Sequence, residues 1–101
     1  MTSVEIRRVE TNKKQYLALL LLADEQEDMI DRYLERGSMY VLEDDGVKAE
    51  CVVTDEGGGV LELKNIAVEP DFQGKGYGKA LVDFLIRTYA GQYMLLQVGT
   101  G

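Results

Sequence analysis

Six residues at positions 73–78, reading Gln-Gly-Lys-Gly-Tyr-Gly, have the types and spacing that suit phosphate binding. They follow the apolar run 61–68 and precede the amphipathic segment 79–90, so the order predicts a strand, a glycine loop and a helix. Such a loop leaves backbone N–H groups without acceptors at a helix N-terminus, where they can bind phosphate oxygens. The segment therefore predicts a phosphate-bearing cofactor, and Lys75 and Lys79 are the cations expected beside it.

Two common phosphate-binding patterns do not fit this loop. The Walker pattern requires Ser or Thr after its Gly-Lys pair, but Lys79 is followed by Ala80, which has no hydroxyl for magnesium. The dinucleotide fingerprint requires glycines at offsets zero, two and five. Gly74 and Gly76 fit the first two offsets, but Lys79 stands at the third, and Pro70 does not suit a tight strand–loop turn.

Composition limits the class of protein. The 101 residues, 46% of them hydrophobic with a single proline, suffice for one compact domain spanning 1–101. A net charge of -7 argues against nucleic acid as a partner, because phosphate neutralisation requires clustered Lys and Arg. An acidic surface suits a cationic small molecule, although it also serves solubility alone.

The lack of histidine excludes His-based acid–base catalysis and most zinc sites, so we expect no metal site. Cys51 is the single cysteine and cannot form an internal disulfide, which favours a reducing compartment and a buried structural thiol. The longest apolar run, 16–23, is far too short to span a membrane, and the N-terminus has no signal-peptide pattern. We therefore expect a cytoplasmic protein without a membrane partner.

The hydrophobic periodicity predicts the order β-α-α-β-β-β-α-β. Asn12 is the expected cap of the first helix, and Asp24 with Glu27 resembles a capping box for a second helix that Gly37 ends. We expect strands at 4–8, 39–43, 48–54, 60–68 and 93–98, and helices at 12–22, 24–37 and 79–90. Tight turns make the middle strands antiparallel, while the crossover helix makes the last two parallel. The fold class is α/β (α+β): a mixed, mostly antiparallel sheet with helices packed on it.

The loop also matches a third pattern, Gln/Arg-x-x-Gly-x-Gly/Ala, through Gln73, Gly76 and Gly78. It resembles the pyrophosphate loop of the GCN5-related N-acetyltransferases (the GNAT superfamily). The strand 63–68 followed by Glu-Pro and then Phe72 is typical of the entry into this loop in that superfamily, and the element order is also similar. The resemblance covers nearly the whole chain and is strongest over 61–101.

The resemblance implies that acetyl-CoA is the cofactor and that an amine acceptor attacks its thioester directly. The loop backbone would bind the pyrophosphate, the strand ending at Val68 would pair with the pantetheine arm, and an N–H of Ile66 or Ala67 would contact the thioester oxygen. Asn65, an amide in an apolar strand, suggests a bulge beside them. The implied cofactor-binding residues are Ile66, Ala67, Val68, Gln73, Gly74, Lys75, Gly76, Tyr77, Gly78 and Lys79.

Proton transfer has one candidate residue. Glu62 aligns with the strand position where histone-acetylating members carry a general base, although a surface glutamate on an alternating strand is the simpler explanation. Four acidic residues between the first two helices border the superfamily's acceptor groove, where they would attract a cationic acceptor. Helix capping also accounts for two of them. These four are Asp24, Glu25, Glu27 and Asp28.

The chain departs from the superfamily at its C-terminal end. Members usually continue past a strand such as 95–98 with a helix and two more strands, and the helix often supplies a tyrosine that protonates the CoA thiolate. Tyr77, Tyr89 and Tyr93 are poor substitutes for it. We therefore expect a domain truncated after the fifth strand, whose bare edge at 93–98 favours a homodimer or a strand-exchanged oligomer.

Three functional hypotheses follow from the sequence. The first is an acetyl-CoA-dependent N-acetyltransferase. The second is a CoA-binding fragment or module without turnover, which a second copy or a missing segment would complete. The third is an acidic interaction domain whose glycine loop binds nothing.

Overall fold

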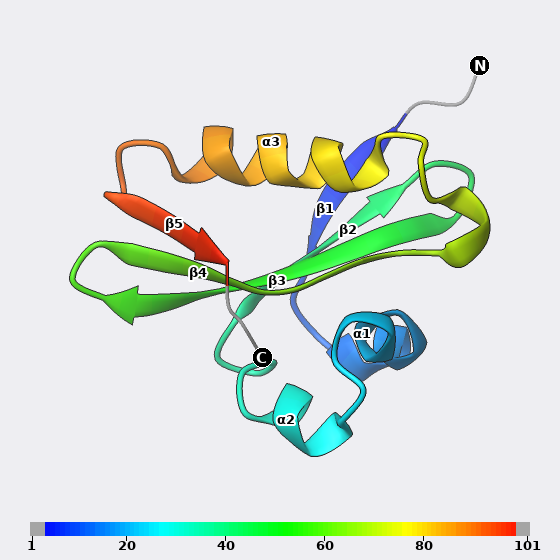
Figure 1. Ribbon diagram of the computed structural model, residues 1–101, viewed down its shortest axis with the longest axis horizontal. Helices are drawn as coiled ribbons and strands as arrows, with labels where there is room; N and C mark the ends of the chain where they lie inside the picture. Colours follow the sequence, from blue (N-terminus) through cyan, green and yellow to red (C-terminus); the bar gives the residue numbers. More distant parts are fainter. Residues whose placement is uncertain (1–3, 99–101) are drawn as a thin grey trace.

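A computed structural model describes residues 4–98 as one five-stranded sheet with helices on both faces (Figure 1). The elements in chain order are β1 (Glu5–Val9), the 3-10 helix η1 (Lys13–Tyr16), α1 (Leu17–Ala23), α2 (Glu27–Asp31), β2 (Ser38–Glu43), β3 (Val47–Gly57), β4 (Val60–Val68), the 3-10 helix η2 (Pro70–Phe72), α3 (Tyr77–Tyr89) and β5 (Leu95–Val98).

The strand order in the sheet is β1-β2-β3-β4-β5. The first four strands pair antiparallel with their neighbours, while β4 and β5 pair in parallel because α3 returns the chain to the starting end. The mixed, mostly antiparallel sheet expected from the sequence is confirmed. Both β1 and β5 are edge strands among the described residues.

The two faces of the sheet carry separate hydrophobic cores. On one face α3 packs through Leu81 and Leu85, with Phe84 and Tyr89 partly buried beside them. On the other face α1 and α2 cover a cluster that includes Leu20 of α1, Ile30 of α2, and Tyr33 and Leu34 just after α2. Figure 1 shows α3 above the sheet and α1 and α2 below it.

The predicted capping of both N-terminal helices is wrong. Asn12 adopts a left-handed conformation with φ 50° and makes no side-chain cap, and the first helical turn is a 3-10 helix instead of an α-helix. The second helix is shorter than expected, with Gln26 at the N-cap position. Asp24 forms a local turn instead of a capping box, since its Oδ1 accepts from the backbone N–H of Gln26 at 3.4 Å.

A buried lysine, which no sequence pattern indicated, connects the two ends of this region. Lys13 Nζ donates to the carbonyl oxygens of Leu34 and Gly37, each at 2.8 Å, and to that of Glu35 at 3.3 Å. These carbonyls lie just after α2, where helical oxygens have no intrahelical donor. The ammonium group therefore joins the start of η1 to the segment that leads into β2.

Two C-terminal boundaries differ from the prediction. The helix α3 begins at Tyr77, two residues earlier than expected, because Gly76 has a left-handed φ of 90° and completes the turn. The strand β5 begins at Leu95 instead of residue 93, since Tyr93 forms only an isolated bridge to Ala90. Within residues 4–98, no helix has the length and apolar character needed to cross a membrane.

Candidate cofactor site

The site begins at an irregularity in β4. The pairing of β3 with β4 shifts register so that Val52 faces Asn65 while Val53 faces Leu63, which leaves Lys64 as an extra residue. This confirms the bulge that Asn65 suggested. Among the described residues, β4 pairs with β5 as far as Leu63, whose partner Val98 is the last residue described. Within that part of the chain, positions 64–68 of β4 pair with β3 only, and we call their other side the free edge.

Asn65 holds the bulge against the α1–α2 face. Its Nδ2 donates to the backbone oxygen of Leu20 and to the hydroxyl oxygen of Tyr33, both at 3.0 Å. The side chain is almost fully buried, and its Oδ1 has no partner among the described residues. These bonds connect β4 with α1, so the position of the free edge depends on the packing of that helix.

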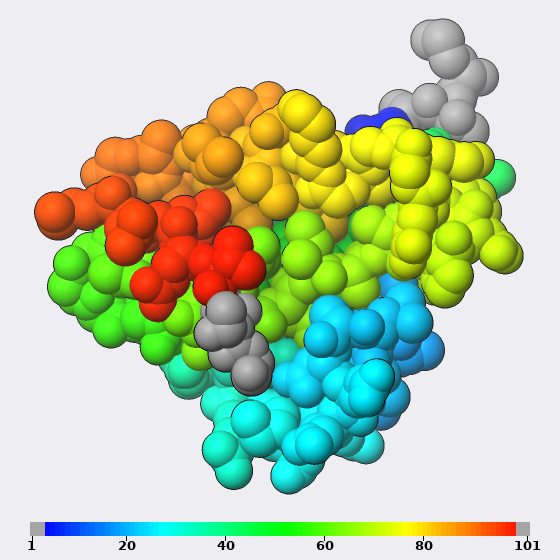
Figure 2. Space-filling view, viewed as in Figure 1, coloured from blue at the N-terminus to red at the C-terminus, as the bar shows by residue number. Residues whose placement is uncertain are grey.

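A pocket of about 310 Å³ opens beside this free edge. Five of the ten residues expected to bind the cofactor line it, and Leu22 of α1 forms its remaining wall. Figure 2 shows the surface of β4 between β5 in red, the glycine loop in yellow and α1 in blue. The five residues are Ile66, Ala67, Val68, Gln73 and Gly78.

The glycine loop presents an uncapped helix N-terminus at the pocket. Gly74 and Gly76 have φ of 80° and 90°, which side-chain-bearing residues rarely adopt. The Ala80 N–H donates to the Gly76 oxygen at 3.0 Å, so the N–H groups of the three preceding residues have no acceptor within α3. No side chain caps this end. The geometry suits an anion bound by backbone N–H groups.

Two side chains hold the loop in place. Gln73 Nε2 donates to the Val68 oxygen at 3.2 Å, which joins the loop to the end of β4. Tyr77 points away from the pocket and donates its hydroxyl to Asp44 Oδ2 at 2.5 Å, and this bond raises the pKa of Tyr77. Tyr77 therefore contributes its backbone to the loop and uses its side chain to attach the loop to the β2–β3 turn.

Positive charge gathers beside the loop although the chain is acidic. Lys75 Nζ lies 5.3 Å from the ring centroid of Phe72, and Lys48 Nζ lies 4.6 Å from the same ring. Lys79 pairs with Asp83 at 2.8 Å. Sequence reasoning missed Lys48, because the fold brings it to the loop from the distant strand β3.

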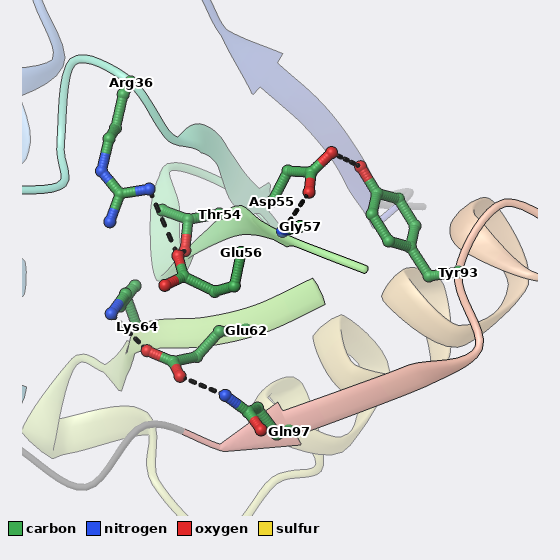
Figure 3. A network of polar contacts seen from close by, with 9 residues as sticks. All are labelled: Arg36, Thr54, Asp55, Glu56, Gly57, Glu62, Lys64, Tyr93 and Gln97. Atoms are coloured by element: carbon green, nitrogen blue, oxygen red, sulfur yellow. Dashed lines mark hydrogen bonds and ion pairs between the residues drawn. The ribbon is translucent and has the colours of Figure 1, made fainter. Parts of the chain in front are cut away.

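Glu62, the candidate base, lies in a polar network outside the pocket (Figure 3). It forms an ion pair with Lys64 and accepts a hydrogen bond from Gln97 Nε2 at 2.5 Å. Its bond to Lys64, and next its bond to Gln97, lower the pKa of Glu62. The carboxylate is therefore ionised at neutral pH and is a weaker base than a free glutamate.

Glu50 on β3 is a buried carboxyl group that the sequence pattern did not single out. It is fully buried, it faces Val41 and Ala67 across the sheet, and neither of its oxygens has a partner among the described residues. Burial raises the pKa of Glu50 to about 8. The one sequence feature that could have indicated this burial is that Glu50 is the single charged residue in the apolar run 49–53.

The other candidate residues have local partners. Glu27 pairs with Lys14 at 2.7 Å, and Asp24 accepts from the Tyr33 hydroxyl at 3.4 Å, so these acidic groups have structural roles. Glu25 and Asp28 are exposed. Tyr93 donates to Asp55 Oδ2 at 3.0 Å, away from the cofactor pocket (Figure 3). Tyr89 and Tyr40 share a hydroxyl–hydroxyl hydrogen bond of 2.6 Å.

Cys51 is a buried structural thiol, as expected. It is fully buried beneath α3, and this burial strongly raises its pKa, so it carries no thiolate at neutral pH. Within residues 4–98, no three His, Cys, Asp or Glu side chains are arranged to hold a metal ion.

Comparisons with known proteins agree with this geometry. The family model for the acetyltransferase (GNAT) domain matches residues 35–100. The uncharacterized N-acetyltransferase YvbK of Bacillus subtilis (strain 168) is 38% identical over 94 residues, which are 91% of this chain and 60% of that protein. The chain thus spans less than two thirds of that relative's length.

Two solved structures have similar folds. The IAA acetyltransferase from Bacillus cereus ATCC 14579 has a TM-score of 0.85 and 41% identity, over 98% of this chain and 67% of that one. A GNAT family acetyltransferase from Elizabethkingia anophelis with acetyl-CoA bound has a TM-score of 0.89 and 31% identity, over 97% of this chain and 65% of that one. This chain belongs to the GNAT acetyltransferase family.

Proposed function

We propose that this chain binds acetyl-CoA in the pocket between β4 and α3 and transfers the acetyl group to an amine. One observation carries the proposal: the free edge of β4 and the uncapped N-terminus of α3 meet at the same pocket. An extended, amide-containing ligand that ends in a pyrophosphate matches both parts. The relative from Elizabethkingia anophelis, described with acetyl-CoA bound, supports this choice of ligand.

The pyrophosphate would accept hydrogen bonds from the backbone N–H groups of residues 74–79. Each bond to a charged acceptor contributes about 1.5–3 kcal/mol. Lys75 of the loop and Lys48 of β3 add positive potential beside it. The chain's own groups therefore neutralise the anion, and we expect binding to require no metal ion.

The pantetheine arm would pair with the free edge of β4 in the manner of an added strand. The residues after the bulge, Ile66 and Ala67, line the pocket at the place where a thioester would follow this arm. A backbone N–H there would donate to the thioester oxygen and stabilise the negative charge that forms during attack by the amine.

Glu62 is the proposed proton acceptor, acting through a bound water molecule. An amine with a pKa of about 10.4 is largely protonated at neutral pH, which costs roughly 4–5 kcal/mol before attack. The ion pair with Lys64 keeps Glu62 ionised, as an acceptor requires, although it lowers its basicity. A loss of rate in Glu62→Gln that shrinks as pH approaches the pKa of the amine would support this role. An equal loss at every pH would contradict it.

Binding is tested by calorimetry with CoA on the Gly76→Val variant. A valine at φ 90° would distort the loop, and its β-branched side chain would block the approach of the phosphate. Gly91→Val is the matched control, because Gly91 has φ 85°, an open Cβ position and a place at the far end of α3. Loss of affinity in Gly76→Val alone supports the proposal, while unchanged affinity in both variants refutes it. A large loss on adding EDTA would contradict metal-independent binding.

Gly78 tests the pocket by a different mechanism. It lies in the first turn of α3, and an added Cβ would contact Val68 at an ordinary 3.7 Å. The positive-φ argument thus applies to Gly74 and Gly76 and does not apply to Gly78. Gly78→Val should weaken CoA binding by filling the pocket that Gly78 lines.

A CoA-binding module without turnover, completed by a second copy or a further segment, is the second candidate. The chain covers 60% of the length of its Bacillus subtilis relative. Assaying acetyl transfer to a panel of small and peptide amines separates the two candidates. Turnover supports the enzyme, whereas CoA binding without turnover supports the module. We place either activity in the cytoplasm, consistent with one buried, reduced thiol.

A further inference from the structure

The sheet edge formed by β1, opposite the proposed cofactor site, has a surface that takes no part in the proposed function. β1 pairs with β2 on one side only among the described residues, so alternate backbone groups along its outer side have no strand partner. A groove of about 760 Å³ runs between β1 and α3. Its apolar lining includes Ile6 and Phe84, and also Val4 and Ile86, which are each 54% exposed.

Within the described part of one chain, the acidic side chain of β1 has no basic partner. Glu5 lies directly opposite Glu43 of β2, and like charges at such a position are destabilising. Arg7 donates to Glu43 at 3.1 Å and to the Tyr16 hydroxyl at 3.2 Å. Glu5 has no ion-pair partner among residues 4–98. A cation placed opposite Glu5 on the outer side would relieve this imbalance.

The register of two antiparallel β1 strands is limited by geometry. Opposite residues must both direct their backbone groups toward the partner strand or both direct them away, so a two-fold axis must pass through a residue position. An axis at Arg7 places two arginines together, and an axis at Glu5 places two glutamates together. Only an axis at Ile6 opposes unlike charges, pairing Glu5 of each chain with the partner's Arg7.

We propose that a second copy of this chain docks on β1, with the two β1 strands antiparallel about a two-fold axis at Ile6. Ile6 then contacts the partner's Ile6 on the α3 side, beside the groove. Glu5 meets the partner's Arg7 on the opposite side, twice per dimer. The result is one continuous ten-stranded sheet, in which the exposed side chains of Val4 and Ile86 adjoin the interface.

The other sheet edge is the competing interface. β5 reads Leu-Leu-Gln-Val and carries no charge that would select a register, although Leu95 and Val98 are 52% and 71% exposed. Its neighbour β4 also carries the cofactor pocket. Charge complementarity therefore favours β1, whereas the exposed apolar residues of β5 provide an alternative that a separate variant can test.

The test is a charge exchange followed by sedimentation of the full 101-residue chain. Glu5→Arg sets two arginines opposite each other and should raise the dimer dissociation constant at least about tenfold. Arg7→Glu should do the same, and the double variant Glu5→Arg/Arg7→Glu should restore dimerisation. Glu5→Arg also removes the repulsion from Glu43, so this variant should stay folded, and its circular dichroism spectrum and unchanged CoA affinity check that it does. Its affinity for CoA, bound at the distant edge, should not change.

Three results would overturn the proposal. The first is a wild-type chain that sediments as a monomer at protein concentrations up to about 1 mM. A dimer with a larger dissociation constant would be too weak to count as a specific interface. The second is a dimer that Glu5→Arg leaves intact. The third is a dimer abolished by Leu95→Lys alone, which would assign the interface to β5.

Discussion

The two faces of the sheet differ in how they treat buried polar groups. Beneath α3, aromatic rings pack edge to face, as in Tyr40 and Phe84 with centroids 5.0 Å apart, and the Tyr40 hydroxyl has a partner in Tyr89. Beneath α1 and α2, Lys13 is buried with three carbonyl partners, while Glu50 and Asn65 keep oxygens without any. All the partnerless buried side-chain oxygens of the described residues lie on this second face.

The two faces therefore differ in whether their buried polar groups stabilise or destabilise the fold. The α3 face follows the rule that buried polar atoms find partners, so it can hold the glycine loop rigidly. The α1–α2 face retains groups that cost stability, and Asn65 joins that face to the bulge beside the pocket. Removing the partnerless charge of Glu50 should therefore raise stability, whereas removing a buried group that has partners, such as Lys13 or the Tyr40 hydroxyl, should lower it.

The largest effect should come from Glu50. Burial raises its pKa from 4.5 to about 8. Between these values the folded chain keeps a proton that the unfolded chain has released, so the free energy of unfolding falls as pH rises through this window. The full penalty, about 5 kcal/mol, is present above the folded pKa and absent below the unfolded one.

Glu50→Gln should remove this pH dependence. Urea unfolding at pH 5, 6, 7 and 8 should show the variant gaining stability over the wild type as pH rises. The buried amide of the variant changes its free energy of unfolding by an amount that does not depend on pH. The readout is therefore how the difference in free energy of unfolding between variant and wild type changes with pH. A difference that does not change with pH would show that Glu50 is hydrated or paired in solution.

Lys13→Met should have the next largest effect, this time destabilising. The change keeps the apolar stem but leaves the carbonyls of Leu34 and Gly37 without a donor, at a cost of about 2–3 kcal/mol. Lys14→Met is the matched control, because Lys14 pairs with Glu27 and Asp31 in solvent and should cost about 1 kcal/mol or less. Equal losses in urea unfolding would contradict the assigned role of Lys13.

Tyr40→Phe should have the smallest effect, about 1 kcal/mol, since it removes one neutral hydrogen bond and keeps the ring contact with Phe84. Tyr89→Phe should cost a similar amount. The double variant should lose little more than either single one, because the two hydroxyls bond to each other. Additive losses in thermal unfolding would mean that each hydroxyl has a separate partner.

Much of the fold was predictable because its patterns are local. The bounds of β4 matched the prediction because a glycine turn and Pro70 delimit a strongly apolar run. The start of α3 was not predictable, since Gly78 lies in the helix although it reads as part of the loop. The φ angle of Gly76 decides where the helix begins. Because glycine adopts either sign of φ, the residue type alone does not indicate this boundary.

The site was predictable only where a motif carries it. The motif predicted the loop and the strand before it, and two motif residues, Gln73 and Gly78, line one pocket together with Ile66, Ala67 and Val68 of β4. Lys48, Lys13 and Glu50 were missed because their roles depend on contacts between distant segments. A strand pattern does not reveal that a helix covers the polar face, so Glu50 reads as an ordinary alternating residue until α1 and α2 are placed on it.

The bulge in β4 also has a consequence for how such a chain changes by descent. Leu61 and Leu63 face α3, and so do Ile66 and Val68, so Lys64 is the one residue that interrupts the alternation. Losing its single codon would leave every core side chain on its present face. The strand would become regular, and the bend beside the free edge would disappear. One three-nucleotide insertion or deletion can therefore create or remove this bend in the strand while the hydrophobic cores stay unchanged.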